Sequence, residues 1–168
     1  MIGVDINISI MKIYCENDNV IEIPYNTLNG ISLSNLNLHR AKLENMDLSN
    51  TTFFQSNLRG AFLFNSILMK SNLSYTKLMT ADLRDTVLLD ADLSDSIASY
   101  CDFSHSKLQG SNFQGAKIDF ANFTGANVSN ANMLCIDFEK AIFKDTIYNI
   151  ETVWPKGFDP LINGCILL

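Results

Sequence analysis

The chain has 168 residues, a formal net charge of −6 at pH 7 and a hydrophobic content of 47%. This acidic balance argues against a direct nucleic-acid ligand, because binding to phosphates needs clustered Lys and Arg. The four cysteines lie far apart without a CxxC pair, which indicates neither a zinc site nor a disulfide framework. We expect one domain with a continuous core, no cofactor, and a reducing, cytoplasmic location.

Residues 1–27 contain two candidate strands. The alternation of Val4, Ile6, Ile8 and Ile10 with polar residues is typical of a half-buried strand. The polar run 16–19 predicts a turn, and residues 20–23 predict a second strand that ends before a proline. The polar residues at 5 and 7 interrupt any signal peptide, and no stretch is long and apolar enough to span a membrane. We expect a hairpin that caps the segment that follows.

A strict period of five residues runs from Leu33 to Phe143. Every fifth residue of this segment, here called a centre, is Leu, Phe, Ile, Val or Met, with Ala98 as the exception. Two residues before each centre, from Ala41 to Ala141, the residue is Ala, Ser, Thr or Cys except at 46 and 136. A helix repeats at about 3.6 residues and a strand at about 2, so neither explains this period. Short tandem units of this kind predict a solenoid in which each unit buries its apolar side chains against its neighbours.

Units such as Ala81-Asp82-Leu83 and Ala121-Asn122-Phe123 closely resemble the pentapeptide-repeat family, over about residues 26–148. The resemblance implies an all-β protein, a right-handed quadrilateral β-solenoid in which four pentapeptides form one coil and residues 20 apart stack. The centre and small residues then face inward, and like side chains share columns, as do Phe103, Phe123 and Phe143. An array of short amphipathic helices or a low-complexity polar tract is the alternative, and the single register argues against both.

On this interpretation the hairpin cap is residues 1–27, the solenoid residues 28–148 and a C-terminal cap residues 149–168. The segment from Thr152 to Pro160 resembles the tail of many pentapeptide-repeat proteins, abundant in cyanobacteria. Trp154 and Phe158 are expected to cover the last coil. The apolar residues between Leu161 and Leu168 either complete this cap or join two chains as a homodimer.

Ala98 is the weak point of the interior. The column neighbours of this residue are Leu78 and Ile118, so either a void remains there or Ile97 turns inward.

Nothing in the sequence assembles a catalytic or metal site. The only histidines, His39 and His105, are expected to face outward and lie far apart, without a nucleophile and base at suitable spacing. Asp85 and His105 share a column, which predicts a surface ion pair rather than a catalytic dyad. We therefore predict that the chain is not an enzyme.

Two functional hypotheses follow. The first is a non-enzymatic scaffold or protein-binding module with an unidentified protein partner. The alternative, implied by the resemblance, is a DNA mimic that binds DNA gyrase or another type II topoisomerase. It depends on a locally acidic band with a single cation, Arg84. The band consists of Asp82, Asp85, Asp90, Asp92, Asp95 and Asp102. However, no loop interrupts the coils, and outward Asp residues commonly serve as turn residues.

A candidate partner surface lies at positions that should face outward yet are apolar. Residues around two stacked centres share one side, and two aromatic residues lie just across a corner from them. Because large exposed apolar patches mark partner surfaces or self-association, we favour this patch over the acidic band. The patch is bordered by Lys70 and Asp90. It comprises Phe62, Phe64, Ile67, Met69, Val87 and Leu89.

Overall fold

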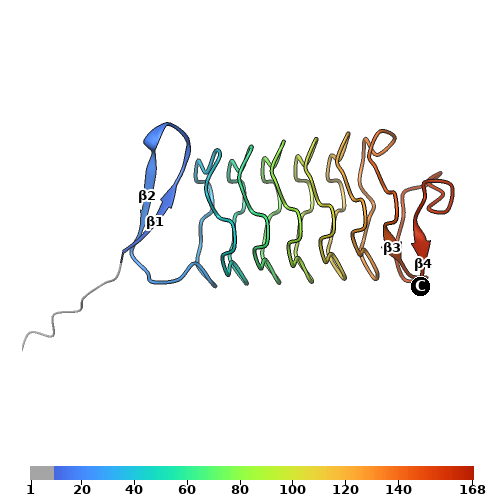
Figure 1. The fold of residues 1–168 in the computed structure, drawn as a ribbon, viewed down its shortest axis with the longest axis horizontal. Helices are drawn as coiled ribbons and strands as arrows, with labels where there is room; N and C mark the ends of the chain where they lie inside the picture. Colours follow the sequence, from blue (N-terminus) through green and yellow to red (C-terminus); the bar gives the residue numbers. More distant parts are fainter. Residues whose placement is uncertain (1–9) are drawn as a thin grey trace, which may run out of the picture.

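The five-residue period folds into coils stacked along one axis, as Figure 1 shows for the computed structural model, which describes residues 10–168. Parallel bridges join residues 20 apart, beginning with Ser32 and Thr52 and continuing to Asn127 and Ile147. The centre residues are fully buried along most of the rod. The predicted right-handed quadrilateral β-solenoid is confirmed, and its core is a narrow column of large side chains enclosed by four strips of backbone.

Each corner of a coil is a tight turn. At a representative corner, the amide of Ala41 donates to the carbonyl of Leu38 at 3.0 Å. The residue between them in the corner, Arg40, has a φ of 52°. A left-handed third residue is the signature of a type II turn and favours Gly or Asn. The prevalence of Gly, Asn and Asp two residues after the centres therefore has a backbone cause.

Aromatic residues form one of the internal columns. Phe103 and Phe123 are stacked with ring centroids 4.9 Å apart, and Phe123 and Phe143 are stacked at 5.2 Å. These distances match the spacing of neighbouring strands, about 4.8 Å. The predicted phenylalanine column is confirmed, and offset stacking adds to the area that these rings bury.

An antiparallel hairpin covers the N-terminal end of the rod. Its strands are β1 (Met11–Tyr14) and β2 (Val20–Ile23), connected by the short 3-10 turn η1 (Glu16–Asp18). Ile13 and Ile23 are buried, and the amide of Lys42 donates to the carbonyl of Tyr14 at 2.8 Å. The hairpin thus supplies apolar side chains and a backbone acceptor to the first coil. Val4, Ile6 and Ile8, which the sequence assigns to a strand, lie outside the described residues.

The C-terminal end is covered by aromatic side chains. Phe158 lies 4.9 Å from Phe143 and 4.6 Å from Trp154, measured between ring centroids. Strand β3 (Ile147–Tyr148) then pairs in parallel with β4 (Ile166–Leu167). Cys165 is buried beside this pair. The apolar side chains of the tail that remain exposed are Leu161, Ile162, Ile166, Leu167 and Leu168.

One segment departs from the predicted register. Ile136, predicted to face inward, is 43% exposed, and its bridge to Lys117 spans 19 residues rather than 20. Cys135 is buried in its place, while the next centre, Phe138, is only half-buried and packs edge-on against Phe158. Isoleucine is larger than the Ala, Ser, Thr or Cys that fills this position from Thr51 to Ala131, although Leu36 and Met46 stay half-buried at it in the first coils without a change of spacing. The prediction of an unbroken register to residue 143 is therefore wrong at 134–138.

Ala98 keeps its inward position without help from its neighbour. The methyl group is fully buried, whereas Ile97 faces outward, half-buried, in the bridges to Lys77 and Lys117. Of the two alternatives that the sequence allows, the inward rotation of Ile97 is wrong.

Candidate partner-binding surfaces

The outward side chains of the rod occupy three positions per unit. The residue before a centre carries the bridge to the next coil, the residue after it is usually half-buried, and the following residue lies at the corner. We call the side with centres Leu48, Leu68, Leu88 and Leu108 the Leu68 side. The adjoining side, with centres Leu43, Leu63, Leu83 and Phe103, is called the Leu63 side.

Four of the six residues of the predicted apolar patch lie on the Leu68 side. Ile67 bridges Val87 directly, and Ile67 is 40% exposed. On one side of the rod, each coil contributes one rung, and Met69 and Leu89 lie on the rungs of Ile67 and Val87. The amide of Lys70 donates to the carbonyl of Leu89 at 2.8 Å. These side chains stack as the 20-residue spacing predicts. Met69, Val87 and Leu89 are half-buried, so the patch is flatter than fully exposed side chains would make it.

The two aromatic residues of the patch lie on the Leu63 side. Phe62 and Phe64 flank the centre Leu63 and are half-buried. The guanidinium of Arg40 lies 5.9 Å from the ring centroid of Phe62, a cation–π contact that covers part of this ring. The corner residue Asn65 separates them from Ile67. The six residues therefore lie on two sides of the rod rather than in one plane.

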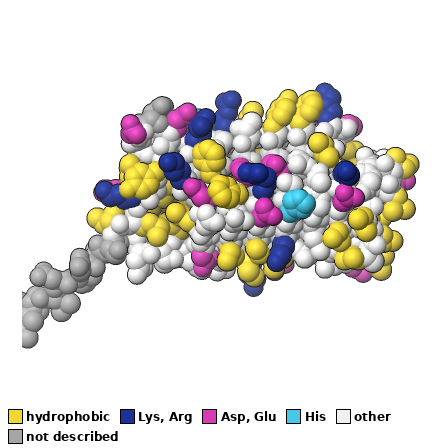
Figure 2. Space-filling model, in the orientation of Figure 1, with side chains coloured by type: hydrophobic (Ala, Val, Ile, Leu, Met, Phe, Trp, Pro, Cys, Tyr) yellow, Lys and Arg dark blue, Asp and Glu magenta, His cyan; other side chains and the backbone are white. Residues whose placement is uncertain are grey.

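The predicted acidic band encircles the rod. Asp82 and Asp102 lie on the Leu63 side, Asp92 lies on a different side, and the other three occupy corners with positive φ. Asn112 donates its side-chain amide to Asp92 at 3.1 Å, and Asn122 donates in the same way to Asp102. These carboxylates also accept backbone amides two residues further on. The Asp residues therefore act in ladders and turns, and no side presents a continuous acidic field. Figure 2 shows both signs of charge interspersed on the face that it displays.

The carboxylate of Asp82 is paired rather than free. Arg84 donates to it through two nitrogens, with Nη2 2.7 Å from Oδ2 and Nε 2.8 Å from Oδ1. This bidentate hydrogen bonding holds the pKa of Asp82 below its usual range and raises the pKa of Arg84. The pair neutralises part of the acidic band.

The two histidines have different surroundings, and neither faces a nucleophile in the described contacts. His39 Nε2 lies 2.7 Å from a carboxylate oxygen of Glu16, which fastens the hairpin turn η1 to the first coil. The ring of His105 lies over Gly125, where an added Cβ would collide with it. Among residues 10–168 no ion pair joins Asp85 to His105, so that prediction is wrong.

The cysteines are free thiols. Cys101 is buried and donates to the carbonyl of Leu78 at 2.7 Å. Burial raises the pKa of Cys135 and of Cys165 to about 12, so these thiols stay protonated and unreactive at neutral pH. In the part of the chain that the structure describes, no cluster of His, Cys, Asp or Glu is arranged to hold a metal ion.

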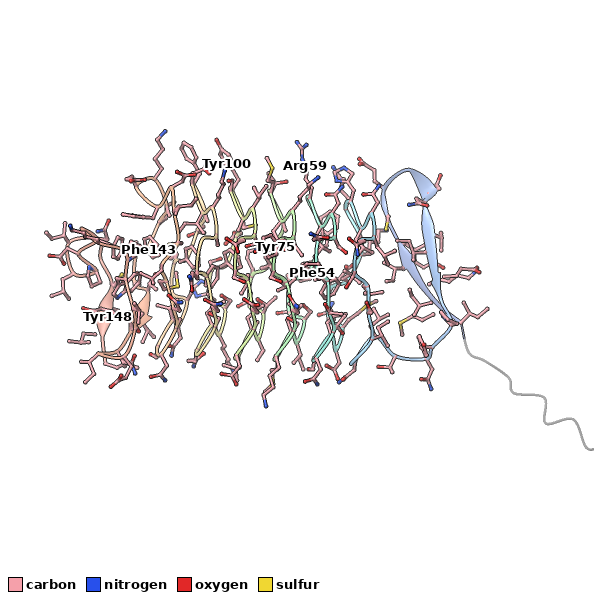
Figure 3. The ribbon with its side chains drawn as sticks, turned by 180° about the vertical axis from the view of Figure 1, so that it is seen from behind. Phe54, Arg59, Tyr75, Tyr100, Phe143 and Tyr148 are labelled. Carbon is pink, nitrogen blue, oxygen red and sulfur yellow. The ribbon has the colours of Figure 1, made fainter. Side chains whose placement is uncertain are left out.

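Sequence reasoning missed an aromatic stack at one corner. Tyr100 and Phe120 are nearly parallel, with centroids 4.7 Å apart, and Lys140 Nζ lies 4.9 Å from the centroid of Phe120. Both rings are exposed, and both residues have positive φ, which is strained for bulky side chains. Figure 3 places Tyr100 at the edge of the rod, away from Phe54 and Tyr75, which form a second aromatic contact. The 20-residue spacing of Tyr100 and Phe120 at a corner position was the signal available in the sequence.

The protein is a quadrilateral β-solenoid, a rod of stacked, hydrogen-bonded coils. Its interior is filled with side chains, so the outward side chains are the ones that can contact a partner. The family model for pentapeptide repeats matches this chain in eight copies, over residues 27–53, 47–85, 87–119 and 121–147. The chain belongs to the pentapeptide-repeat family.

Solved structures of this family are similar to the chain. HetL, a protein involved in heterocyst differentiation regulation in the cyanobacterium Nostoc sp. strain PCC 7120, is 19% identical, with 74% of this chain and 70% of HetL covered and a TM-score of 0.42. A pentapeptide repeat protein from the cyanobacterium Cyanothece 51142 is 31% identical over 64% of this chain and 60% of its own, with a TM-score of 0.35. QnrB1, a plasmid-mediated fluoroquinolone resistance protein, is 16% identical over 82% of this chain and 92% of its own, also with a TM-score of 0.35.

No curated protein matches the chain significantly. Among residues 10–168 there is also no helix with the length and apolar character needed to cross a membrane.

Proposed function

We propose that the chain is a non-enzymatic protein-binding module and that the apolar patch is its contact surface. The observation that carries this proposal is the direct stacking of Ile67 on Val87 beside Met69 and Leu89, with polar outward residues on the coils directly before and after them. The interior is filled by the centres and by the small residues two positions before them, to which these four side chains do not belong. Contiguous apolar side chains on a rigid surface favour binding to another protein.

The experiment compares two double variants as bait for proteins from an extract of the source cells. Met69→Glu with Leu89→Lys places opposite charges in the patch. The matched control, Met79→Glu with Leu134→Lys, makes the same two changes at residues that also follow a centre, on other sides of the rod. We expect the patch variant to lose the proteins that the wild type and the control capture. Equal capture by both variants would remove the patch from the proposal.

The DNA-mimic alternative stays a prediction. The described contacts of the acidic band do not favour it, since Asp82, Asp92 and Asp102 are used within the rod. A gyrase supercoiling assay, with and without a quinolone, tests it directly. Unchanged gyrase activity at high protein excess would eliminate this alternative.

A further inference from the structure

We infer that the Leu68 side binds a second copy of this chain, face to face and with the two rods antiparallel. This inference rests on the proposed function and names the partner of the same patch. Its basis is the order of side chains along the rod. In the column before the centres, an acid, two apolar residues and a base follow one another on successive rungs. These bridged residues are Asp47, Ile67, Val87 and Lys107.

That order is self-complementary under a two-fold axis. If the axis lies in the contact plane, along the strands and midway between the rungs of Ile67 and Val87, each Ile67 faces the second copy's Val87. The same operation places Asp47 opposite the second copy's Lys107. The apolar pair then forms the centre of the contact, and an attractive charge pair lies at each end of it.

The column after the centres obeys the same symmetry. Met69 faces the second copy's Leu89, so the apolar residues of both columns meet apolar residues of the second copy. On the flanking rungs, Ser49 faces Gln109, which places polar against polar. No position of these two columns between residues 47 and 109 opposes like charges in this arrangement. Sequence patterning along two independent columns therefore supports one geometry.

The corner column fixes the register. Lys70 and Asp90 occupy successive corners, because the amide of Lys70 bonds to the rung of Leu89 and the amide of Asp90 bonds to the rung of Gln109. Under the proposed axis, each Lys70 faces the other copy's Asp90, and the two contacts lie side by side along this one corner. Gly110 has no side chain, and the carboxylate of Asp90 lies over it, along this corner. Between residues 10 and 168 no ion pair within the chain engages Lys70 or Asp90.

Competing arrangements oppose like charges or lose the attractive contacts. Moving the axis onto the rung of Ile67 brings Lys70 against Lys70, and moving it onto the rung of Val87 brings Asp90 against Asp90. Parallel rods, related by an axis along the rod, place Asp90 opposite the corner of Arg84 and Asp85 and lose both Lys70–Asp90 contacts. Repulsion in the alternatives selects the proposed register as effectively as attraction within it.

The contact area predicts a weak dimer. Four rungs at about 4.8 Å span only about 14 Å between the first and the last. The apolar centre is therefore smaller than that of a standard stable interface, which buries about 800 Å² per partner. We expect association that depends on protein concentration rather than a permanent dimer.

Charge exchange at the corner tests the geometry. Sedimentation velocity is run over a range from about 10 to about 500 µM on the full chain, with circular dichroism as the check of folding. Lys70→Glu alone and Asp90→Lys alone each convert two attractive contacts into two repulsive ones, and we expect each to weaken the dimer at least about tenfold. The double exchange, Lys70→Glu with Asp90→Lys, should restore it. Lys117→Glu, which changes the net charge as Lys70→Glu does but on another side, should leave the dimer unchanged.

The decisive sample is a mixture of the two single variants. In a mixed dimer, Glu at 70 of one chain faces Lys at 90 of the other, and Asp90 of the first faces Lys70 of the second. A mixture that dimerises when neither variant does so alone supports the antiparallel register. Sedimentation unaffected by either single exchange, or an unrestored double exchange, would overturn it. If sedimentation overturns the dimer while Met69→Glu with Leu89→Lys still abolishes capture of other proteins, the proposed function stands and only the second copy is excluded.

Discussion

The middle of the rod and its C-terminal quarter carry the same sequence period but differ in how faithfully the backbone follows it. From Leu33 to Met133 every centre is fully buried and every bridge spans 20 residues. Beyond Met133 the next bridge spans 19 residues, Phe138 is half-buried, and the chain leaves the period to cover the end. The large centres do not explain this difference, because they continue to Phe143.

The register slips at a coil where a large residue stands at the small inward position, although Leu36 and Met46 hold the same position in the first coils without a slip. At the corner of each coil the residue at this position lies beside the backbone, where Ser and Thr hydroxyls donate to centre carbonyls, as Thr76 does to Leu73 at 2.6 Å. Isoleucine at 136 has neither the size nor the hydrogen-bonding group for this place. The chain slips by one residue so that Cys135 enters instead. Close packing thus outweighs the regularity of the larger side chains.

The largest expected effect comes from a centre in the middle of the rod. Leu88→Ala should lower the free energy of unfolding by about 2 to 5 kcal/mol, because a fully buried leucine is removed from a narrow column that cannot collapse around the cavity. Phe138 is a centre by its place in the sequence period, but its ring is only half-buried. Phe138→Ala should therefore lower the free energy of unfolding distinctly less. Equilibrium denaturation in urea measures both values. A cost for Phe138→Ala equal to or above that for Leu88→Ala would contradict the slipped register.

Leu88 and Phe138 also show which features of the structure the sequence can predict. The period, the resemblance and the stacking rule together predict the position of Leu88 and of the phenylalanine column, because each depends only on a repeat length. The slip at Ile136 depends on the volume of one side chain in one corner, and no repeat length reports it. The Tyr100–Phe120 stack was signalled only by two aromatic residues 20 apart at a corner position, where most units carry Gly, Asn or Asp.

The surface patch is predicted in part from the sequence. The 20-residue rule places Ile67 on Val87, but the degree of exposure depends on side-chain conformations that a repeat pattern does not contain. The same limit applies to the acidic band, whose members share an interval of sequence without sharing a side.

Removing the tail tests the C-terminal quarter itself. Deleting residues 161–168 removes β4 and the buried Cys165, so we expect a folded rod with a melting temperature lower by several degrees, at about 2 to 4 °C per kcal/mol for a chain of this length. The sequence leaves open whether this tail completes the cap or joins two chains. Sedimentation of the deleted protein separates the roles. Unchanged thermal stability together with loss of a dimer would assign the tail to association rather than capping.

Ala98→Leu probes the opposite situation, a centre that is too small. The residue is fully buried beneath an outward-facing Ile97, so a larger side chain should fill space between Leu78 and Ile118. We expect a stabilisation of up to about 1 kcal/mol, measured by thermal and urea denaturation. A strong fall in the melting temperature would show that neighbouring side chains already fill this coil.

The smallest expected effect concerns the polar exterior of the middle coils. Because hydrogen bonds from Arg84 lower the pKa of Asp82, the folded state favours the ionised carboxylate more than the unfolded chain does. The stabilisation is therefore present at pH above the unfolded value of about 3.9 and is lost as pH falls through the lower folded value. Asp82→Asn should cost under about 1 kcal/mol at pH 7, since solvent screens a surface pair, and the difference from wild type should shrink below about pH 4. Combining it with Arg84→Gln should add little, because both changes remove the same contact. A difference between wild type and Asp82→Asn that stays constant from pH 7 to about pH 2 would show that the ion pair contributes nothing and that the side chain acts only as a turn residue.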